Sequence, residues 1–195
     1  MDIKPIETYY NGYRFRSRLE ARWAVLFDTL GILYQYEPQG FQLSDGTYYL
    51  PDFYLPTLDV WVEVKGVMTD ADMHKIEQFR NDRGDRMQRE GMLWVVGQIP
   101  NEKQAKDTCI AYNYKEFEYP IFSVDWDYPY LLCTCPVCGK IGIEFDGRGD
   151  RVCGTKCTGD DDKGYTSDHP KILNAYKAAR QARFEHGEQP IINKF

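Results

Sequence analysis

The chain has 195 residues, of which 43% are hydrophobic and 15% aromatic, and its formal net charge is −6. This composition is that of a folded chain with one sizeable core and excludes a disordered one. The negative charge excludes a general attraction to nucleic acid, so such binding would need a local basic patch. The sequence has no apolar run of membrane-spanning length, and its first residues lack the apolar core of a signal peptide. We therefore expect a cytoplasmic protein that does not bind membranes.

Helix and strand patterns alternate along the first half of the chain. Apolar residues at helical spacing over 17–31 predict an amphipathic helix, with Ser17 as its start signal and Gly31 as its stop signal. A second helical pattern covers 69–91, and a buried strand is expected at 92–100. Between the two helices, β-prone runs predict strands at 32–38, 46–55 and 60–66.

The second half of the chain changes in composition at Cys133. The aromatic-rich segment 101–132 predicts one or two further strands, and the pattern of 169–188 predicts a final helix. Five of the six cysteines lie between Cys133 and Cys157, which is followed by an acidic linker. We therefore divide the chain into a core with an aromatic-rich extension (1–132), a cysteine segment (133–158), and the linker with a basic C-terminal helix (159–195).

Charged residues interrupt two of the predicted strands. Asp52 follows a proline in one, and Glu63 and Lys65 alternate with valines in the next. Because side chains alternate across a strand, Glu63 and Lys65 share a face, and a hairpin of the two strands would bring Asp52 close to Glu63. Two adjacent carboxylates favour a proton or a cation between them, and oxygen ligands suit Mg²⁺ or Mn²⁺. With a lysine to orient water or stabilise charge, this set could hydrolyse a phosphodiester.

The Glu-x-Lys tripeptide taken alone is better explained by a surface ion pair on a half-exposed strand, with Asp52 in a turn. The surrounding pattern changes that interpretation. The pieces SRLEARWAVLFDTLGI, YQYEP, YLPDFYLP and VWVEVKG are followed by a helix and by the strand MLWVV. In order and spacing they resemble the PD-(D/E)XK nuclease superfamily, over roughly residues 14–97. The resemblance implies the restriction-endonuclease-like fold, a mixed β-sheet flanked by helices.

The same resemblance implies roles for individual residues. Asp52 and Glu63 would bind the catalytic metal together with the carbonyl of Val64, and Lys65 would be the catalytic lysine. Many members of the superfamily add a glutamate from the first helix, where Glu20 stands in this sequence. A helix capping box of the form Ser-x-x-Glu explains the same glutamate equally well.

The cysteines form two closely spaced pairs, separated by fourteen residues. Two thiolate pairs at this spacing fit a tetrahedral zinc site of the ribbon type, which has no open position and is therefore structural. Cys133 is an alternative to the first ligand, His169 is a weaker substitute, and a set of free structural thiols is the other explanation. The expected zinc ligands are Cys135, Cys138, Cys153 and Cys157.

Basic residues on two predicted helices are candidates for contacts with nucleic-acid phosphates. Arg18 and Arg22 lie one turn apart on the first helix, and the last helix carries Lys177, Arg180 and Arg183. Ordinary solvated helix surface is the alternative explanation for both groups.

We therefore predict an α/β nuclease core with a small four-cysteine zinc-ribbon insertion and a C-terminal helix. Its function would be Mg²⁺- or Mn²⁺-dependent hydrolysis of DNA by an endonuclease, in a bacterium or a phage-infected host. The alternatives are an inactive nuclease-fold module that binds nucleic acid or protein, and an RNase or exonuclease. Cutting both DNA strands would need either a homodimer or two successive events.

Overall fold

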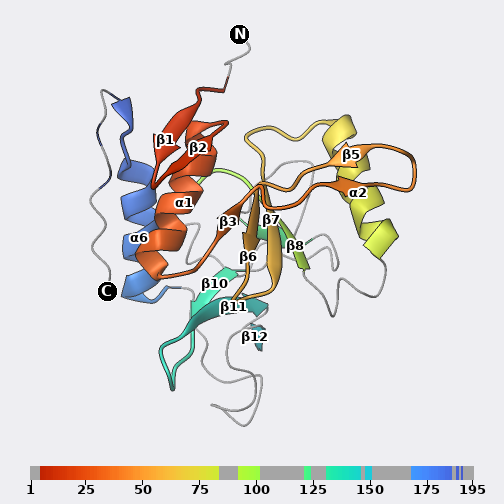
Figure 1. Ribbon diagram of the computed structural model, residues 1–195. Coiled ribbons are helices and arrows are strands. Elements are labelled where there is room, and N and C mark those ends of the chain that lie inside the picture. Colours follow the sequence, from red (N-terminus) through yellow and green to blue (C-terminus); the bar gives the residue numbers. More distant parts are fainter. Residues whose placement is uncertain are drawn as a thin grey trace.

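The computed structural model describes residues 5–83, 92–101, 121–123, 131–145, 148–150, 168–185, 188 and 190. Over these ranges the fold is mixed α/β, with three helices and several sheets. The largest sheet lies in the middle, with helices on both sides (Figure 1). Its strands stand in the order β3 (Gln35–Tyr36), β6 (Phe53–Leu55), β7 (Val60–Val64), β8 (Met92–Val96) and β9 (Ile121–Ser123).

Strand β7 is the middle strand of this sheet and has a different kind of neighbour on each side. It pairs antiparallel with β6, where Phe53 stands opposite Val62, as the predicted hairpin requires. It pairs parallel with β8, and the chain between these two strands contains helix α2 (Asp70–Arg83). A parallel pair needs such a crossover, because a tight turn cannot return the chain to the same end of the sheet.

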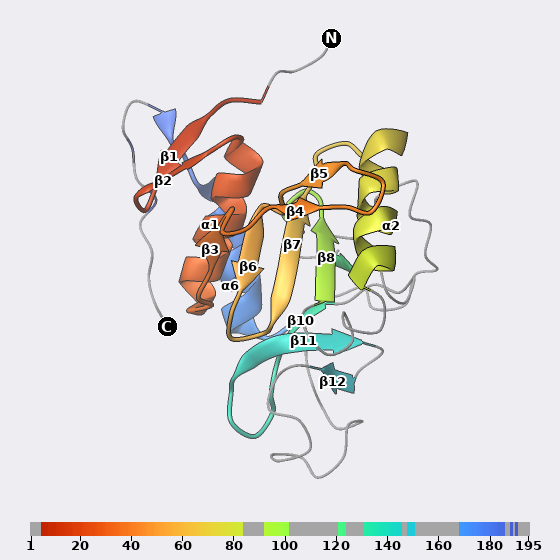
Figure 2. The ribbon, with the colours of Figure 1, turned by 45° about the vertical axis from the view of Figure 1, so that its right-hand side comes forward.

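Helices α1 (Arg18–Leu30) and α6 (Pro170–Gln181) pack against each other on one face of the sheet (Figure 2). The start and stop signals of α1 are confirmed: the Ser17 hydroxyl accepts a hydrogen bond from the Glu20 amide, and Gly31 takes the left-handed conformation at φ 70°. The valines of β7 pack into the core that these helices form. Its helical members include Trp23, Leu26, Phe27, Ile172, Tyr176 and Ala179.

The opposite face of the sheet is covered by α2 and by a small hairpin of β4 (Phe41–Gln42) and β5 (Tyr48–Tyr49). Ile76 and Phe79 from α2 pack there against Trp61 and Tyr49. The alternation in β7 therefore sends its valines towards α1 and Trp61 towards α2, and the strand is buried on both faces.

The remaining strands form two smaller sheets. Strand β10 crosses the predicted boundary between residues 132 and 133, and Leu132 packs in the same core as α1. In both ribbon views the sheet that contains β10 lies beyond the end of the central sheet that is remote from β5 (Figure 2). The strands are β1 (Thr8–Tyr10) with β2 (Tyr13–Phe15), and β10 (Leu131–Thr134) with β11 (Ile141–Phe145) and β12 (Arg148–Asp150).

Several predicted elements are shorter than expected. The single strand expected at 46–55 is divided into β5 and β6, which belong to different sheets, because Pro51 lacks the N–H that a continuous ladder needs. The strand expected at 32–38 shrinks to two residues, and the last helix ends at Gln181. Within the described residues, no helix is both long and apolar enough to cross a membrane.

Candidate active site

The end of β7 next to the β4–β5 hairpin carries the charged residues of the motif (Figure 2). Glu63 is only 5% exposed, because its side chain lies on the α2 side of the strand, beneath the small hairpin. Its Oε2 accepts a hydrogen bond of 3.0 Å from the Tyr49 hydroxyl, and its Oε1 lies 2.9 Å from the Lys65 amine. The explanation as a surface ion pair on a half-exposed strand is therefore wrong.

Asp52 directly precedes β6 and is 7% exposed. The register that sets Phe53 opposite Val62, continued by one residue, sets Asp52 opposite Glu63. The Asp52 carboxylate accepts a hydrogen bond of 2.7 Å from the Val64 amide, which ties the end of one strand to the other. The hairpin thus brings the two carboxylates to the same end of the sheet, as the sequence predicted.

At both carboxylates, burial and neighbouring negative charges outweigh the nearby positive charge and hydrogen bonds, so the pKa of each is raised. Burial raises the pKa of Asp52 well above its usual range, and the negative charges of Glu63 and Glu20 raise it further. Burial also raises the pKa of Glu63, although Lys65 and the Tyr49 hydrogen bond lower it in part. A buried acidic pair in this condition binds a proton or a cation more readily than a solvated pair does.

Lys65 lies between two carboxylates. Its amine is 2.9 Å from Glu63 and also 2.9 Å from Asp72, in the first turn of α2. Burial lowers the pKa of Lys65, but the two carboxylates outweigh this effect and the pKa is raised. Sequence reasoning missed Asp72; the available signal was the capping pattern Thr69-x-x-Asp72, in which the Asp72 carboxylate accepts from the Thr69 hydroxyl at 2.6 Å.

Glu20 lies near this acidic pair but is bonded to the start of its own helix and to Tyr36 of β3. Its Oε1 accepts from the Ser17 hydroxyl at 2.7 Å, and its Oε2 accepts from the Arg16 amide at 3.0 Å and from the Tyr36 hydroxyl at 2.7 Å. Both oxygens are therefore occupied, which favours the capping explanation over a role as metal ligand. Glu20 nevertheless borders the same cavity as Asp52.

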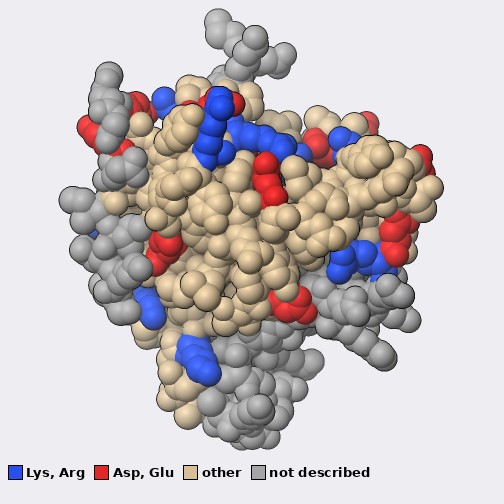
Figure 3. Space-filling view, in the orientation of Figure 1, with Lys and Arg blue, Asp and Glu red and all other residues tan. Residues whose placement is uncertain are grey.

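That cavity has a volume of about 720 Å³ and is open to solvent beside the motif. A smaller hollow of about 190 Å³ adjoins it, and Arg16, Leu50, Glu63 and Lys65 line both. On the face of the molecule shown in Figure 3, basic side chains lie beside acidic ones in the upper part, above a largely uncharged surface.

The donor set at the motif suits a hard divalent ion. Mg²⁺ is commonly held by one or two carboxylates and keeps several waters, and the cavity offers Asp52, Glu63 and the backbone of Val64. In the described part of the chain, no three His, Cys, Asp or Glu side chains converge as a metal-binding group. An ion here would therefore complete its coordination with the Val64 carbonyl and water.

Family models, curated proteins and solved structures were compared with this chain, and none matches it.

The basic residues predicted to contact phosphates differ in their exposure and in whether they have a partner within the chain. Arg18 pairs with Glu185 at 3.0 Å, and the Arg180 guanidinium donates to the carbonyl of Pro100. Arg180 therefore joins α6 to the core, and Arg18 joins α1 to the segment after α6. Arg22 is half-buried on α1, whereas Lys177 and Arg183 are exposed on and just after α6.

The first cysteine pair lies in the turn between β10 and β11. The Gly139 amide donates to the Cys135 carbonyl at 3.0 Å, and the Cys135 amide donates to the Lys140 carbonyl at 2.9 Å, so the turn is tight. Cys135 is buried and Cys138 is exposed, while the predicted ligands Cys153 and Cys157 lie outside the described residues.

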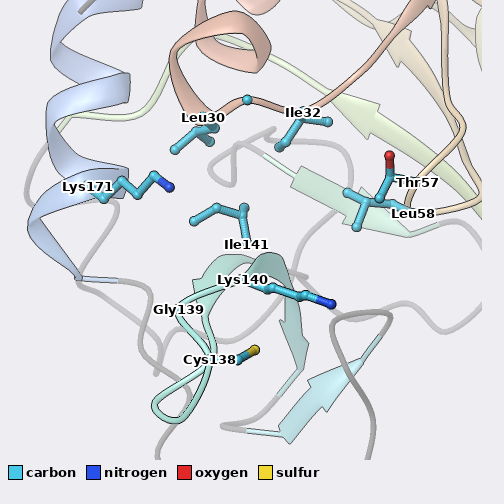
Figure 4. Close-up of a pocket in the computed structure, with 10 residues that line it drawn as sticks. Leu30, Ile32, Thr57, Leu58, Cys138, Gly139, Lys140, Ile141 and Lys171 are labelled. Carbon is cyan, nitrogen blue, oxygen red and sulfur yellow. The ribbon is translucent and has the colours of Figure 1, made fainter. Parts of the chain in front are cut away.

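This turn rests against the end of α1. Cys138, Lys140 and Ile141 face Leu30 and Ile32 across a cavity of about 410 Å³ (Figure 4). Ile141 also packs against the core that contains Leu30 and Ile32, so the cysteine segment contacts the main core beside this cavity.

The alternative zinc ligands are also located. Cys133 is buried in β10, opposite Gly142 of β11. His169 caps α6, with its Nδ1 accepting from the Lys171 amide at 3.2 Å. A capping role accounts for this histidine without a metal.

Proposed function

We propose that this protein is a metal-dependent endonuclease that hydrolyses phosphodiester bonds of DNA. The observation that carries the proposal is the buried carboxylate pair of Asp52 and Glu63 at one end of a β-hairpin, with the Lys65 amine 2.9 Å from Glu63. Burying two carboxylates beside each other costs stability unless cations or hydrogen-bond donors compensate their charge. Here the acidic pair borders an open cavity, where a cation and a substrate can reach it.

Each residue has a defined task in this proposal. Asp52, Glu63 and the Val64 carbonyl would hold Mg²⁺ or Mn²⁺, which when bound supplies charge neutralisation on the phosphate and a nucleophile at neutral pH. Lys65 holds its proton, because two carboxylates contact its amine. A protonated amine at this place stabilises the negative charge that develops on the phosphate and orients the attacking water.

The arrangement of the sheet supports a restriction-endonuclease-like core as part of the same proposal. An antiparallel hairpin, β6–β7, presents the motif, and the parallel pair β7–β8 follows through α2. This is the order of elements that the resemblance to PD-(D/E)XK nucleases implies.

Zinc would have a structural task. We propose that the tight turn with Cys135 and Cys138 forms one half of a four-cysteine site, completed by Cys153 and Cys157. A closed thiolate site adds folding free energy to a segment too small to fold alone. The ion would thereby fix the β10–β11 turn against α1.

A non-catalytic nuclease-fold module is the second candidate. The observation in its favour is that Lys65 is held by two carboxylates and so is already satisfied without substrate. Such a protein would bind nucleic acid and leave it intact in every metal.

The decisive experiment incubates the protein with closed-circular DNA, linear DNA and RNA, each with Mg²⁺, Mn²⁺ or EDTA. We expect metal-dependent nicking of the circle that Asp52→Ala and Lys65→Ala both abolish. Cutting of linear DNA alone would indicate an exonuclease, and cutting of RNA alone an RNase. Binding without cutting in either metal would leave the non-catalytic module as the function.

A further inference from the structure

The rim of the candidate active site carries an unusual share of exposed apolar side chains. Six large hydrophobic residues are strongly exposed among the described residues, and three of them, Ile6, Tyr48 and Val67, line the two adjoining hollows at the motif. Single exposed apolar residues are ordinary on a protein surface, but a cluster around one opening indicates a binding surface.

Tyr48 is the aromatic member of this group, and the strand β5 sets the direction of its side chain. It is 75% exposed on β5, whereas its neighbour Tyr49 is 5% exposed. The Tyr49 hydroxyl bonds to Glu63 at 3.0 Å, and its ring packs edge-on against Phe79 with centroids 4.9 Å apart. Because side chains alternate along a strand, anchoring Tyr49 inward directs Tyr48 outward at the edge of the smaller hollow.

The charges around this ring fit a phosphate backbone. Lys75 of α2 and Arg16 line the same hollow as Tyr48, together with Lys65. Arg16 pairs with Glu37 and Lys65 with two carboxylates, whereas Lys75 has no ion-pair partner among the described residues. Lys75 is thus the cation most available to an anion that enters beside the tyrosine.

We propose that this hollow binds an unpaired nucleotide of the substrate, with its base stacked on Tyr48 and its phosphate on Lys75. An exposed ring can stack only on a base that has left the double helix, since paired bases are already stacked on each other. The preferred substrate is therefore DNA with unpaired nucleotides beside the cut, such as a single strand or a flap. This inference rests on the proposed function for the identity of the ligand as DNA.

The test measures binding separately from cleavage. Fluorescence anisotropy with Ca²⁺ in place of Mg²⁺ compares a single strand, a flap and a blunt duplex of the same sequence. Stacking contributes roughly 1–3 kcal/mol per base, so we expect Tyr48→Ala to weaken binding of the first two probes about tenfold or more. Tyr48→Phe keeps the ring and should stay within about twofold of the parent, and the blunt duplex should bind weakly to every variant.

Two controls separate stacking from other causes. Tyr48→Leu keeps an apolar side chain without an aromatic face, and it should bind as poorly as Tyr48→Ala. Tyr9→Ala removes a tyrosine that is 64% exposed on β1, away from both hollows, and it should bind like the parent. A 2-aminopurine base in the flap should be quenched by the parent and not by Tyr48→Ala.

Three results would overturn the inference: unchanged binding by Tyr48→Ala, full binding by Tyr48→Leu, or stronger binding of the blunt duplex than of the flap. Full binding by Tyr48→Leu would point to an apolar partner such as a protein. The proposed function is judged independently by cleavage in Mg²⁺. Metal-dependent cleavage together with unchanged binding by Tyr48→Ala would contradict only this inference. Binding that depends on Tyr48 but occurs without cleavage would contradict only the catalytic proposal.

Discussion

Two groups of buried carboxylates border the same cavity, and they are bonded in different ways. Glu20, at the start of α1, is 6% exposed and accepts hydrogen bonds from two hydroxyls and one amide. Asp52 and Glu63, at the end of the β6–β7 hairpin, are 7% and 5% exposed. Asp52 accepts from one amide, and Glu63 accepts from Tyr49 and Lys65.

This difference shows that burial by itself does not identify a functional carboxylate. At Glu20 the fold supplies neutral donors to both oxygens, so the carboxylate serves the helix start. At Asp52 and Glu63 the fold places negative charges together, and the pKa of each group is raised. The first arrangement stabilises the fold. In the second, a proton or a bound cation would relieve the repulsion between the two carboxylates.

The largest expected effect is a difference in DNA cleavage rate between variants of the Asp52–Glu63 region and a variant of Glu20. Asp52→Asn and Lys65→Ala should each lower the DNA cleavage rate about 10³-fold or more, because in the proposed mechanism each removes a group that acts on the reacting phosphate. Glu20→Gln should lower it less than about tenfold, since the amide keeps an acceptor for its neighbours. Nicking rates of closed-circular DNA in Mg²⁺ measure both, and an equal loss in all three variants would make Glu20 part of the active site.

The second effect separates the regions by stability. Glu20→Ala removes three hydrogen bonds: the Ser17 and Tyr36 hydroxyls lose this acceptor, and the Arg16 amide keeps only the Tyr36 oxygen. We expect the free energy of unfolding to fall by roughly 2–3 kcal/mol, measured by urea denaturation. Tyr36→Phe is the control and should cost about 1 kcal/mol. A Glu20→Ala protein as stable as the parent would contradict the capping role.

The third effect is a pH dependence at Asp52. Burial and the charge of Glu63 raise the pKa of Asp52, so protonation favours the folded state. The stability this group contributes is therefore complete below about pH 4, the usual carboxyl range, and is lost as the pH rises through the raised pKa. Asp52→Asn should flatten this decline and, without metal, should be the more stable protein at pH 8 by roughly 1–2 kcal/mol.

Adding metal should have the opposite effect on the stability of the parent at this pH. Mg²⁺ or Mn²⁺ should raise the unfolding temperature of the parent at pH 8, because an ion that binds only the folded state stabilises it. The same ion should leave Asp52→Asn nearly unchanged. Equal stabilisation of both proteins by the metal would place the ion elsewhere.

The smallest effect concerns the tyrosine that bonds Glu63. Tyr49→Phe removes one donor to a buried carboxylate and should cost about 1 kcal/mol of stability with a small loss of cleavage rate. Tyr10→Phe is matched to it, because the Tyr10 hydroxyl bonds Asp28 at 2.8 Å outside the cavity. We expect a similar stability cost there and an unchanged cleavage rate, measured on the same DNA.

Local signals in the sequence predicted the elements that depend on neighbouring residues. Ser17 and Gly31 mark the ends of α1 because a cap acts on the amides and carbonyls of its own turn. The alternation in β7 likewise predicted that Glu63 would project away from the valines. The expected strand at 46–55 was wrong as one unit, because β-propensity does not say which sheet a residue joins.

Contacts that depend on how the elements fold onto one another could not be predicted from the sequence. Asp72 reaches Lys65 only because α2 folds back over the end of β7. Arg18, a candidate for phosphate contact, instead meets Glu185, far along the chain. The predicted zinc site keeps its first pair in a tight turn, and its second pair lies outside the described residues.

The sequence by itself predicted the caps of α1, the alternation of β7 and the hairpin that brings Asp52 close to the Glu-x-Lys strand, because these follow from short-range geometry. Only the tertiary structure decided that Glu63 is buried, that Lys65 has a second carboxylate and that Glu20 is bonded through both oxygens. The physical reason is that the pKa of a carboxylate and the cost of its charge depend on the dielectric and the donors around it. In this protein α2, the β4–β5 hairpin and β3 bring those donors from elsewhere in the chain.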